Sequence, residues 1–469
     1  MSAEIYEKVF ALEAISPIDG RYHDKTKILS PYTSEYALIK TRIEVESKYL
    51  IALSDIGVVR DLNDEERDFL HNMSELSVED ALKVKEIESV THHDVKSIEF
   101  YIKSYLKGTT LEDVSEMVHF GLTSEDVNNI AYRLMLKRGI ENVTIPTLDS
   151  LVERMVETAL EHKDIPMLGR THGQAAEPTT LGKEIIIFAS RLNKQVRRLG
   201  DQNLTGKLNS AVGNYNDLEF ACGDVDWIKF STDFVKSFGL TPNLFTNQIN
   251  SSEDIFEILQ TLQNINGVIV DFNQDMWRYI SDEWMVQQVT EGQIGSSIMP
   301  QKVNPIDFEQ SEGNVYVVNG FINGIVQNLK ASRLQRDLSG STVMRNLGSI
   351  LAYSHLIHVG AEKGLGKVFP NQDAIKTALN NDWSILAGGA QTLLRKHGVD
   401  NPYTLLQDLT KGKKITEDEW KEWAYSLDVD IKVKSKIANM TPETHIGLAV
   451  KLTQMAIEEI KDSRKVKNG

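Results

Sequence analysis

Cysteine is nearly missing from this sequence, which has one in 469 residues. Cys222 has no partner for an internal disulfide, and it offers no thiolate cluster for a structural metal. The acidic opening MSAEIYEKVF also lacks the basic start and apolar stretch of an export signal. We therefore expect a protein of a reducing compartment, which by default is the cytoplasm.

Long apolar runs and an excess of positive charge are also lacking. No window approaches the about 18 uninterrupted apolar residues of a membrane-spanning helix. Lys and Arg number 51 against 67 Asp and Glu, which gives a net charge of −16. Such a field repels nucleic acid and anionic membranes. We therefore expect neither as a partner, and an anionic ligand needs a local basic pocket.

Alternating patterns typical of half-buried strands are scarce, whereas apolar residues at steps of three and four are frequent. Three such stripes predict long helices: Ile255 to Ile280, Leu181 to Leu199, and Val315 to Leu329. We therefore predict an all-α chain with a central bundle of long helices. Stripes on several sides of long helices favour a multi-chain helical core and hence a homo-oligomer.

The chain is too long for one hydrophobic core, and polar stretches near residues 113 and 366 suggest where it divides. The predicted domains are an N-terminal helical domain at 1–113, the long-helix bundle at 114–366 and a C-terminal helical domain at 367–469. Because loops on rigid frames carry most sites, we expect the chemistry where the helices stop.

His172 lies in the break DIPMLGRTHGQAAEP, between glycines and prolines. One interpretation is a capped turn between helices, and the other is a proton donor or acceptor near neutral pH. In THHDVKS, the adjacent His92 and His93 point to different sides of a helix, so we do not expect a metal site. Asp94 there either orders a helix start or orients an imidazole.

Two further breaks also allow two interpretations. In GLTSEDVNN, Thr123 and Ser124 form either a helix N-cap or part of a site. In SRLQRDLSGSTVMRN, the arginines form either a solvated face or a site for phosphate or carboxylate groups, which arginines mixed with hydroxyls recognise.

The stretch EGQIGSSIMPQKVNP, residues 291–305, is the strongest candidate. Its glycines suit a loop that closes over a ligand, and its prolines stiffen the far side. Lys302 and Asn304 supply a charge and an amide at fixed offsets from Ser296 and Ser297. A plain surface loop explains the glycines but not this polar set.

GSSIMPQKVNP resembles the signature of the fumarase, aspartase and argininosuccinate lyase superfamily, and KVNPIDFEQSEGN resembles the bacterial adenylosuccinate lyases. Further segments are similar to that family in its order along nearly the whole chain: SPIDGRY, HDVKSIEF, HFGLTSEDVNN, RTHGQ, VGNYN and QRDLSGSTVMRNLG. The resemblance implies β-elimination of fumarate from adenylosuccinate and from the succinyl-carboxamide intermediate of purine synthesis. It also implies a homotetramer whose active sites draw residues from three chains, and no cofactor is expected.

The resemblance also implies roles for individual residues. His172 would be the general acid that protonates the leaving nitrogen, and Ser296 would be the base. Lys302 and Asn304 would hold the carboxylate where negative charge develops. The remaining residues would bind the anionic nucleotide substrate: Arg21, Tyr22, His92, His93, Asp94, Thr123, Ser124, Gln248, Ser297, Arg336, Ser341, Thr342 and Arg345.

Three residues depart from the family pattern. Gln301 stands where histidine is usual and is more like argininosuccinate lyase, while His92 and Gln310 stand where asparagine is familiar. These departures leave the chemistry intact and affect fine substrate contacts. The alternatives are another lyase of the superfamily, argininosuccinate lyase above all, or a helical scaffold without activity.

Overall fold

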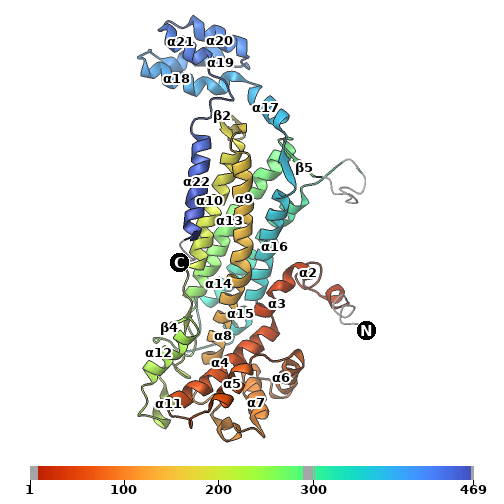
Figure 1. Cartoon of the computed structure of the whole chain (residues 1–469), viewed down its shortest axis with the longest axis vertical. Helices are drawn as coiled ribbons and strands as arrows, with labels where there is room; N and C mark the ends of the chain where they lie inside the picture. Colours follow the sequence, from red (N-terminus) through yellow and green to blue (C-terminus); the bar gives the residue numbers. More distant parts are fainter. Residues whose placement is uncertain (1–8, 289–298, 300–301, 466–469) are drawn as a thin grey trace. The chain divides into compact units, whose positions relative to one another are not determined.

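The computed structural model describes residues 9–288, 299 and 302–465, and helices make up most of it (Figure 1). The chain divides into two compact units. Unit 1 comprises residues 1–147, 196–266 and 314–357, and unit 2 comprises residues 148–195, 267–313 and 358–469. Five long helices run from one unit into the other: α9 (Ile145–Glu161), α10 (Leu181–Gly200), α13 (Glu253–Ser281), α14 (Ile306–Leu329) and α16 (Leu347–Leu365).

Unit 1 contains further, mostly short helices and one pair of parallel two-residue strands. Its elements are α2 (His23–Thr26), η1 (Lys27–Leu29), α3 (Ser30–Thr33), α4 (Glu35–Asp55), α5 (Asp64–Asn72), α6 (Val78–Thr91), α7 (Asp94–Leu106), η2 (Glu112–Met117), α8 (Ser124–Gly139), η3 (Ile140–Thr144), β3 (Thr205–Gly206), α11 (Asn216–Ala221), α12 (Trp227–Ser237), β4 (Thr241–Pro242) and α15 (Ser339–Met344).

Unit 2 contains two antiparallel strand pairs, β1 with β2 and β5 with β6, and the C-terminal helices. Its elements are β1 (Pro166–Thr171), β2 (Gln174–Thr180), β5 (Met285–Gln287), β6 (Val368–Pro370), α17 (Gln372–Asn380), η4 (Trp383–Leu386), α18 (Ala387–Lys396), α19 (Pro402–Thr410), α20 (Glu417–Ser426), α21 (Ile431–Ala438) and α22 (Ala449–Lys465).

The predicted all-α class is confirmed, and so are its three long helices. Each apolar stripe lies on a buried helical face, which in α13 is formed by Ile255, Leu259, Leu262, Ile265, Ile269, Phe272 and Met276. No helix among residues 9–288 and 302–465 is long and apolar enough to cross a membrane. The division into three domains stays a prediction.

Polar side chains set the register of α13 against α14. In unit 1 the hydrogen-bonded pairs are Gln263–Asn323 and Asn266–Asn319, and in unit 2 they are Asn273–Ser311, Gln274–Glu312 and Trp277–Glu309. Positions rise along α13 as they fall along α14, so the two helices are antiparallel. Sliding one helix past the other would leave buried amides unpaired, and this penalty fixes the register.

Candidate active site

His172 lies at the tip of a β-hairpin in unit 2. Thr171 of β1 pairs with Gln174 of β2, so His172 and Gly173 alone form the turn. Their φ angles are 54° and 73°. Two consecutive positive φ angles are typical of the tight turn whose twist matches paired strands. Glycine adopts this conformation freely, whereas histidine pays about 1 kcal/mol for it.

The turn at His172 was predicted, but it joins strands rather than helices. The burial of β1 and β2 does not alternate along either strand, and the register shifts between Leu168 and Arg170. A search for period-two alternation therefore misses this hairpin.

The hairpin is anchored by Arg170, while the imidazole of His172 is exposed. The Arg170 guanidinium pairs with Asp282 and lies 4.4 Å from the ring centroid of Trp284. Among the residues that the structure describes, none forms a hydrogen bond with the His172 ring. The group proposed to transfer a proton is therefore accessible to a ligand.

The other predicted catalytic segment of unit 2 is only partly described. Ser296, Ser297 and Gln301 lie outside the described residues. Lys302 is exposed, and its backbone N–H donates to the Met299 carbonyl at 3.1 Å. The Gln287 side chain donates to the Val303 carbonyl at 2.9 Å, which ties this segment to β5. Asn304 is half-buried just before α14.

In unit 1, Asp94 lies between two arginines. Its Oδ2 atom is 2.7 Å from Arg42 Nη2 and 2.8 Å from Arg345 Nη2. Arg345 also pairs with Glu35 at 3.1 Å. Burial by itself raises the pKa of Asp94, but Arg42 and Arg345, together with the Val95 N–H, hold it below its ordinary value. The carboxylate thus stays charged and fixes the Arg345 guanidinium.

The two adjacent histidines end one helix and begin the next. His92 has φ 53° and ends α6. His93 caps α7, because its Nδ1 atom accepts the Lys96 N–H at 3.1 Å. The helix start predicted for Asp94 is present, but the capping side chain is that of His93, and Asp94 is the first residue of the helix. A role for either ring in substrate binding stays a prediction.

Arg336 contacts the predicted residue Gln248 and also Glu125, which was not predicted, both in unit 1. Its Nη1 atom donates to Gln248 Oε1 at 3.0 Å, and its Nη2 atom is 3.2 Å from Glu125 Oε1. Arg336, Glu125 and Ser341 all line a small cavity of about 60 Å³. The structure thus brings together three segments that lie far apart in the sequence.

The N-cap prediction for Thr123 is confirmed. Thr123 and Asp126 form a reciprocal capping box at the start of α8, and the Thr123 N–H donates to Asp126 at 2.8 Å. Ser124 is the first residue of the helix and is half-buried. Helix capping accounts for Thr123 and Asp126 but leaves the Ser124 hydroxyl available for another role.

Arg21 and Tyr22 lie in the segment that faces Arg345 across a second cavity of unit 1. Tyr22 is the N-cap residue of α2, and Arg21 is exposed. The cavity has a volume of about 200 Å³ and is lined by Asp19, His23 and Arg345. Thr342, on α15, is exposed. Whether these side chains touch one ligand stays a prediction.

Two further residues, Arg42 and His119, have buried polar contacts in unit 1 that were not predicted from the sequence. Arg42 is only 1% exposed and holds Asp94. His119 Nδ1 lies 2.6 Å from Oε1 of the buried Glu46. Burial by itself lowers the pKa of His119, but Glu46 raises it above its ordinary value. His119 opens the segment HFGLTSEDVNN and so had a sequence signal, whereas the burial of Arg42 depends on tertiary packing.

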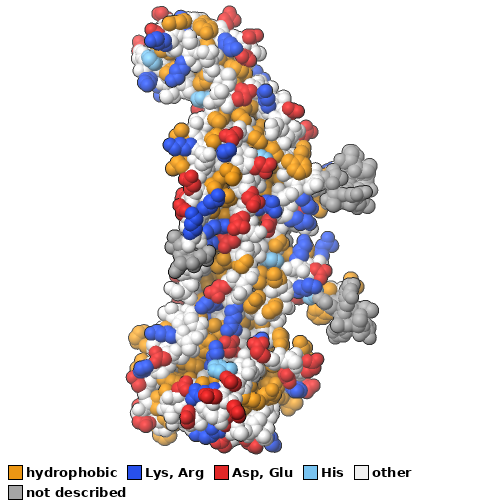
Figure 2. Space-filling view, in the orientation of Figure 1, with side chains coloured by type: hydrophobic (Ala, Val, Ile, Leu, Met, Phe, Trp, Pro, Cys, Tyr) orange, Lys and Arg blue, Asp and Glu red, His pale blue; other side chains and the backbone are white. Residues whose placement is uncertain are grey.

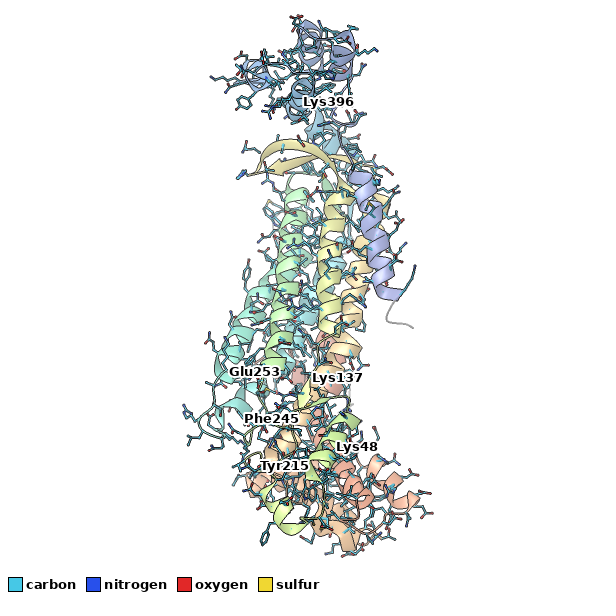
Figure 3. All side chains as sticks on the ribbon, turned by 90° about the vertical axis from the view of Figure 1, so that its left-hand side faces the viewer. Lys48, Lys137, Tyr215, Phe245, Glu253 and Lys396 are labelled. Atoms are coloured by element: carbon cyan, nitrogen blue, oxygen red, sulfur yellow. The ribbon has the colours of Figure 1, made fainter. Side chains whose placement is uncertain are left out.

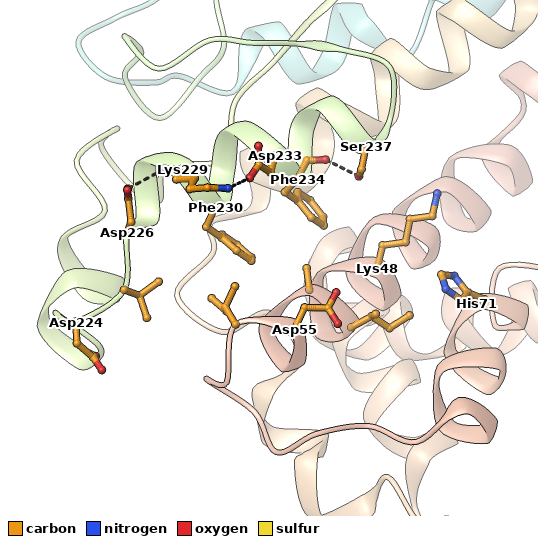
Figure 4. Close-up of a pocket in the computed structure, with 14 residues that line it drawn as sticks. Lys48, Asp55, His71, Asp224, Asp226, Lys229, Phe230, Asp233, Phe234 and Ser237 are labelled. Atoms are coloured by element: carbon orange, nitrogen blue, oxygen red, sulfur yellow. Dashed lines mark hydrogen bonds and ion pairs between the residues drawn. The ribbon is translucent and has the colours of Figure 1, made fainter.

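A larger cavity of about 730 Å³ in unit 1 has no predicted residue in its lining (Figure 4). Phe230 and Phe234 of α12 face the apolar side chains of α4 across it. Its charged groups are largely paired, since Lys229 pairs with Asp233 and Lys48 with Glu44. We do not assign the reaction to this cavity.

Comparison with solved structures identifies the fold. The chain matches a fumarate lyase from Mesorhizobium sp. BNC1 with a TM-score of 0.74 at 16% identity, over 93% of this chain and 97% of that one. It matches the 3-carboxy-cis,cis-muconate lactonizing enzyme from Pseudomonas putida with the same TM-score and identity, over 93% of this chain and 99% of that one. The fold is thus that of a class of helical enzymes that includes a fumarate lyase.

Sequence comparison narrows the class to a family. A lyase family model matches residues 20–320, and an adenylosuccinate lyase C-terminal model matches residues 332–446. The chain is 41% identical to the adenylosuccinate lyase of Haemophilus influenzae, over 94% of this chain and 98% of that one. It is 38% identical to that of Escherichia coli K12, over 96% and 99% of the two chains. The chain therefore belongs to the adenylosuccinate lyase family.

Proposed function

We propose that this chain cleaves adenylosuccinate to AMP and fumarate, and the succinyl-aminoimidazole-carboxamide ribotide to the free carboxamide and fumarate. The observation that carries the proposal is similarity to adenylosuccinate lyases along at least 94% of the chain. Both substrates carry a succinyl group on nitrogen, so one β-elimination serves both. We place the reaction in purine nucleotide biosynthesis and the protein in the cytoplasm.

The elimination breaks one C–H and one C–N bond and forms the C=C bond of fumarate. A base removes the proton from the carbon next to a carboxylate, and an acid protonates the leaving nitrogen. Ser296 is the proposed base and His172 the proposed acid, which suits an imidazole near neutral pH. The exposed position of the His172 ring at a hairpin tip supports this role, because a ligand can reach it.

Negative charge develops on the carboxylate as the proton leaves. Lys302 and Asn304 are proposed to stabilise this charge, since an ammonium group and an amide N–H aimed at it lower the barrier. Arg336 and Arg345, with Arg21, Ser341 and Thr342, are proposed to bind the phosphate and other anionic groups. Each of the first two arginines is already oriented by carboxylates of unit 1. The remaining predicted residues, Tyr22, His92, His93, Asp94, Thr123, Ser124, Gln248 and Ser297, would complete the pocket.

We also propose a homotetramer with active sites shared between subunits. Tyr316, Val317 and Phe321 on α14 are 62%, 43% and 38% exposed. Gly313, Gly320 and Gly324 of the same helix have open space where a Cβ atom would lie. Apolar side chains beside glycines allow close approach of another helix. This surface of α14 supports a contact with another copy of the chain.

A fumarate-release assay tests the proposed activity. The purified protein is incubated with adenylosuccinate and, separately, with argininosuccinate, and the fumarate absorbance and the second product are followed. Release of fumarate and AMP from adenylosuccinate is expected. Cleavage of argininosuccinate alone would assign the chain to the rival activity, and cleavage of neither would support a scaffold without activity.

A further inference from the structure

Lys207 and Asp126 form a buried ion pair in unit 1. Both side chains are 0% exposed, and Lys207 Nζ lies 2.9 Å from Asp126 Oδ1. Removal of two charges from water is unfavourable, and their attraction offsets this only when further hydrogen bonds satisfy both groups. An apolar pair of the same volume would often be as stable. A contribution to stability therefore does not explain why an ion pair is buried here.

Both members of the pair bind backbone groups of loops. Asp126 accepts the Thr123 N–H at 2.8 Å and the Asn209 N–H at 3.0 Å. Lys207 Nζ donates to the Ser210 carbonyl at 2.9 Å. The pair thus joins the start of α8 to the segment 207–215, to which no role has been assigned so far.

The joined loops have a strained backbone. Three non-glycine residues in them have positive φ: His119 at 63°, Ser210 at 68° and Tyr215 at 58°. Ser210 Oγ also donates to the Gly121 carbonyl at 2.7 Å, which links the two loops directly. Strained residues persist only where surrounding contacts hold them, and they cluster at functional sites.

Segment 207–215 also forms hydrogen bonds with the segment that contains Gln248. The Gln248 side chain donates to the Ala211 carbonyl at 2.9 Å, and Asn209 donates to Thr246 at 2.8 Å. A Cβ atom on Gly213 would lie 2.0 Å from the Thr246 carbonyl oxygen. Tyr215 and Phe245, labelled in Figure 3, mark these two segments. Both therefore have little freedom to move apart.

We propose that the Lys207–Asp126 pair is a positioning device that fixes the Thr123–Ser124 loop and the Gln248 segment in the geometry that binds substrate. This inference rests on the proposed function, because Thr123, Ser124 and Gln248 bind substrate only in that account. Lys207 does not touch the substrate and acts through the backbone of the loops. The opposing interpretation is a core pair that only stabilises the unit.

The test replaces the pair with a neutral one of similar size, Lys207→Met with Asp126→Asn. This change leaves no unpaired buried charge, but it removes the ammonium from the Ser210 carbonyl. The control is Leu70→Ala on α5, which empties a buried site of the same unit and lies outside both loops in the sequence. Kinetics with adenylosuccinate and hydrogen exchange of the backbone amides are measured for wild type and both variants.

The double variant is expected to raise KM about tenfold, the effect of losing about one hydrogen-bonded contact. kcat should change less than about threefold, because contacts made equally in the ground and transition states affect KM alone. Amides of residues 119–124 and 209–215 should exchange faster than in Leu70→Ala. An unchanged KM, unchanged exchange in these loops, or the same effects in Leu70→Ala would each overturn the proposal.

Two precautions keep the test decisive. If the double variant does not fold, Ser210→Ala removes only the hydroxyl bond to Gly121, and KM should shift in the same direction by a smaller factor; no shift overturns the proposal. If the wild type does not cleave adenylosuccinate, the proposed function fails. The exchange measurement then still decides whether the pair holds the loops.

Discussion

The loops at the start of α8 in unit 1 and the His172 hairpin in unit 2 are held in opposite ways. Near Thr123, the buried side chains of Asp126 and Lys207 form hydrogen bonds with the backbone of the loops. At His172, a two-residue turn exposes the imidazole. On the face shown in Figure 2, acidic and basic side chains are interspersed. The contrast suggests that the loops around Thr123 are fixed before a ligand binds, whereas the imidazole of His172 makes its contacts only when a ligand is present.

Replacement of His172 by Ala should give the largest effect. Turnover is expected to fall by about two to four powers of ten, the usual contribution of a general acid. Folding should stay near normal, because the ring is exposed. Steady-state kinetics and thermal unfolding measure the two effects, and Gln174→Ala, also exposed at the same turn, is the matched control. Unchanged turnover would remove His172 from the mechanism.

Replacement of Gly213 by Ala tests how rigid the unit 1 loops are. At Gly57, with φ 76° and open space for a Cβ atom, Ala should cost about 1 kcal/mol for the backbone conformation alone. At Gly213, with φ 84° and the Thr246 carbonyl in the way, Ala should cost about 1–3 kcal/mol more. Urea unfolding of both variants gives the difference. Equal losses would mean that these loops can yield.

The smallest effect concerns the protonation of His119. Because Glu46 raises the pKa of His119 against its burial, Glu46→Gln should lower this pKa. A raised folded-state pKa stabilises the protein fully below the unfolded-state pKa, and this contribution is lost as the pH rises through the folded-state pKa. The destabilisation by Glu46→Gln should therefore be greatest below about pH 6.5 and shrink at higher pH.

NMR titration of the His119 ring and urea unfolding across pH measure these two quantities. A His119 pKa that does not change in Glu46→Gln would show that the carboxylate does not control this ring.

Much of the fold followed from local patterns. The apolar stripe from Ile255 to Met276 predicts a helix because buried residues repeat every three or four positions. Thr123 predicts a helix start because the first backbone N–H groups of a helix need a capping partner. The hairpin of β1 and β2 could not be predicted from the sequence, since buried and exposed residues do not alternate along these strands. Arg42 and Lys207 were missed because only tertiary packing buries them. The roles of His172 and Ser296 came from resemblance and stay predictions.

Mixed oligomers test the shared-site account most directly. His172→Ala chains and Arg345→Ala chains are co-expressed with different tags, and assemblies that carry both tags are purified and assayed with adenylosuccinate. If a proton donor from one chain serves binding residues of another, some sites in the mixture contain neither substitution. Activity should then be far above that of either parent variant. Mixed assemblies as inactive as both parents would contradict the account.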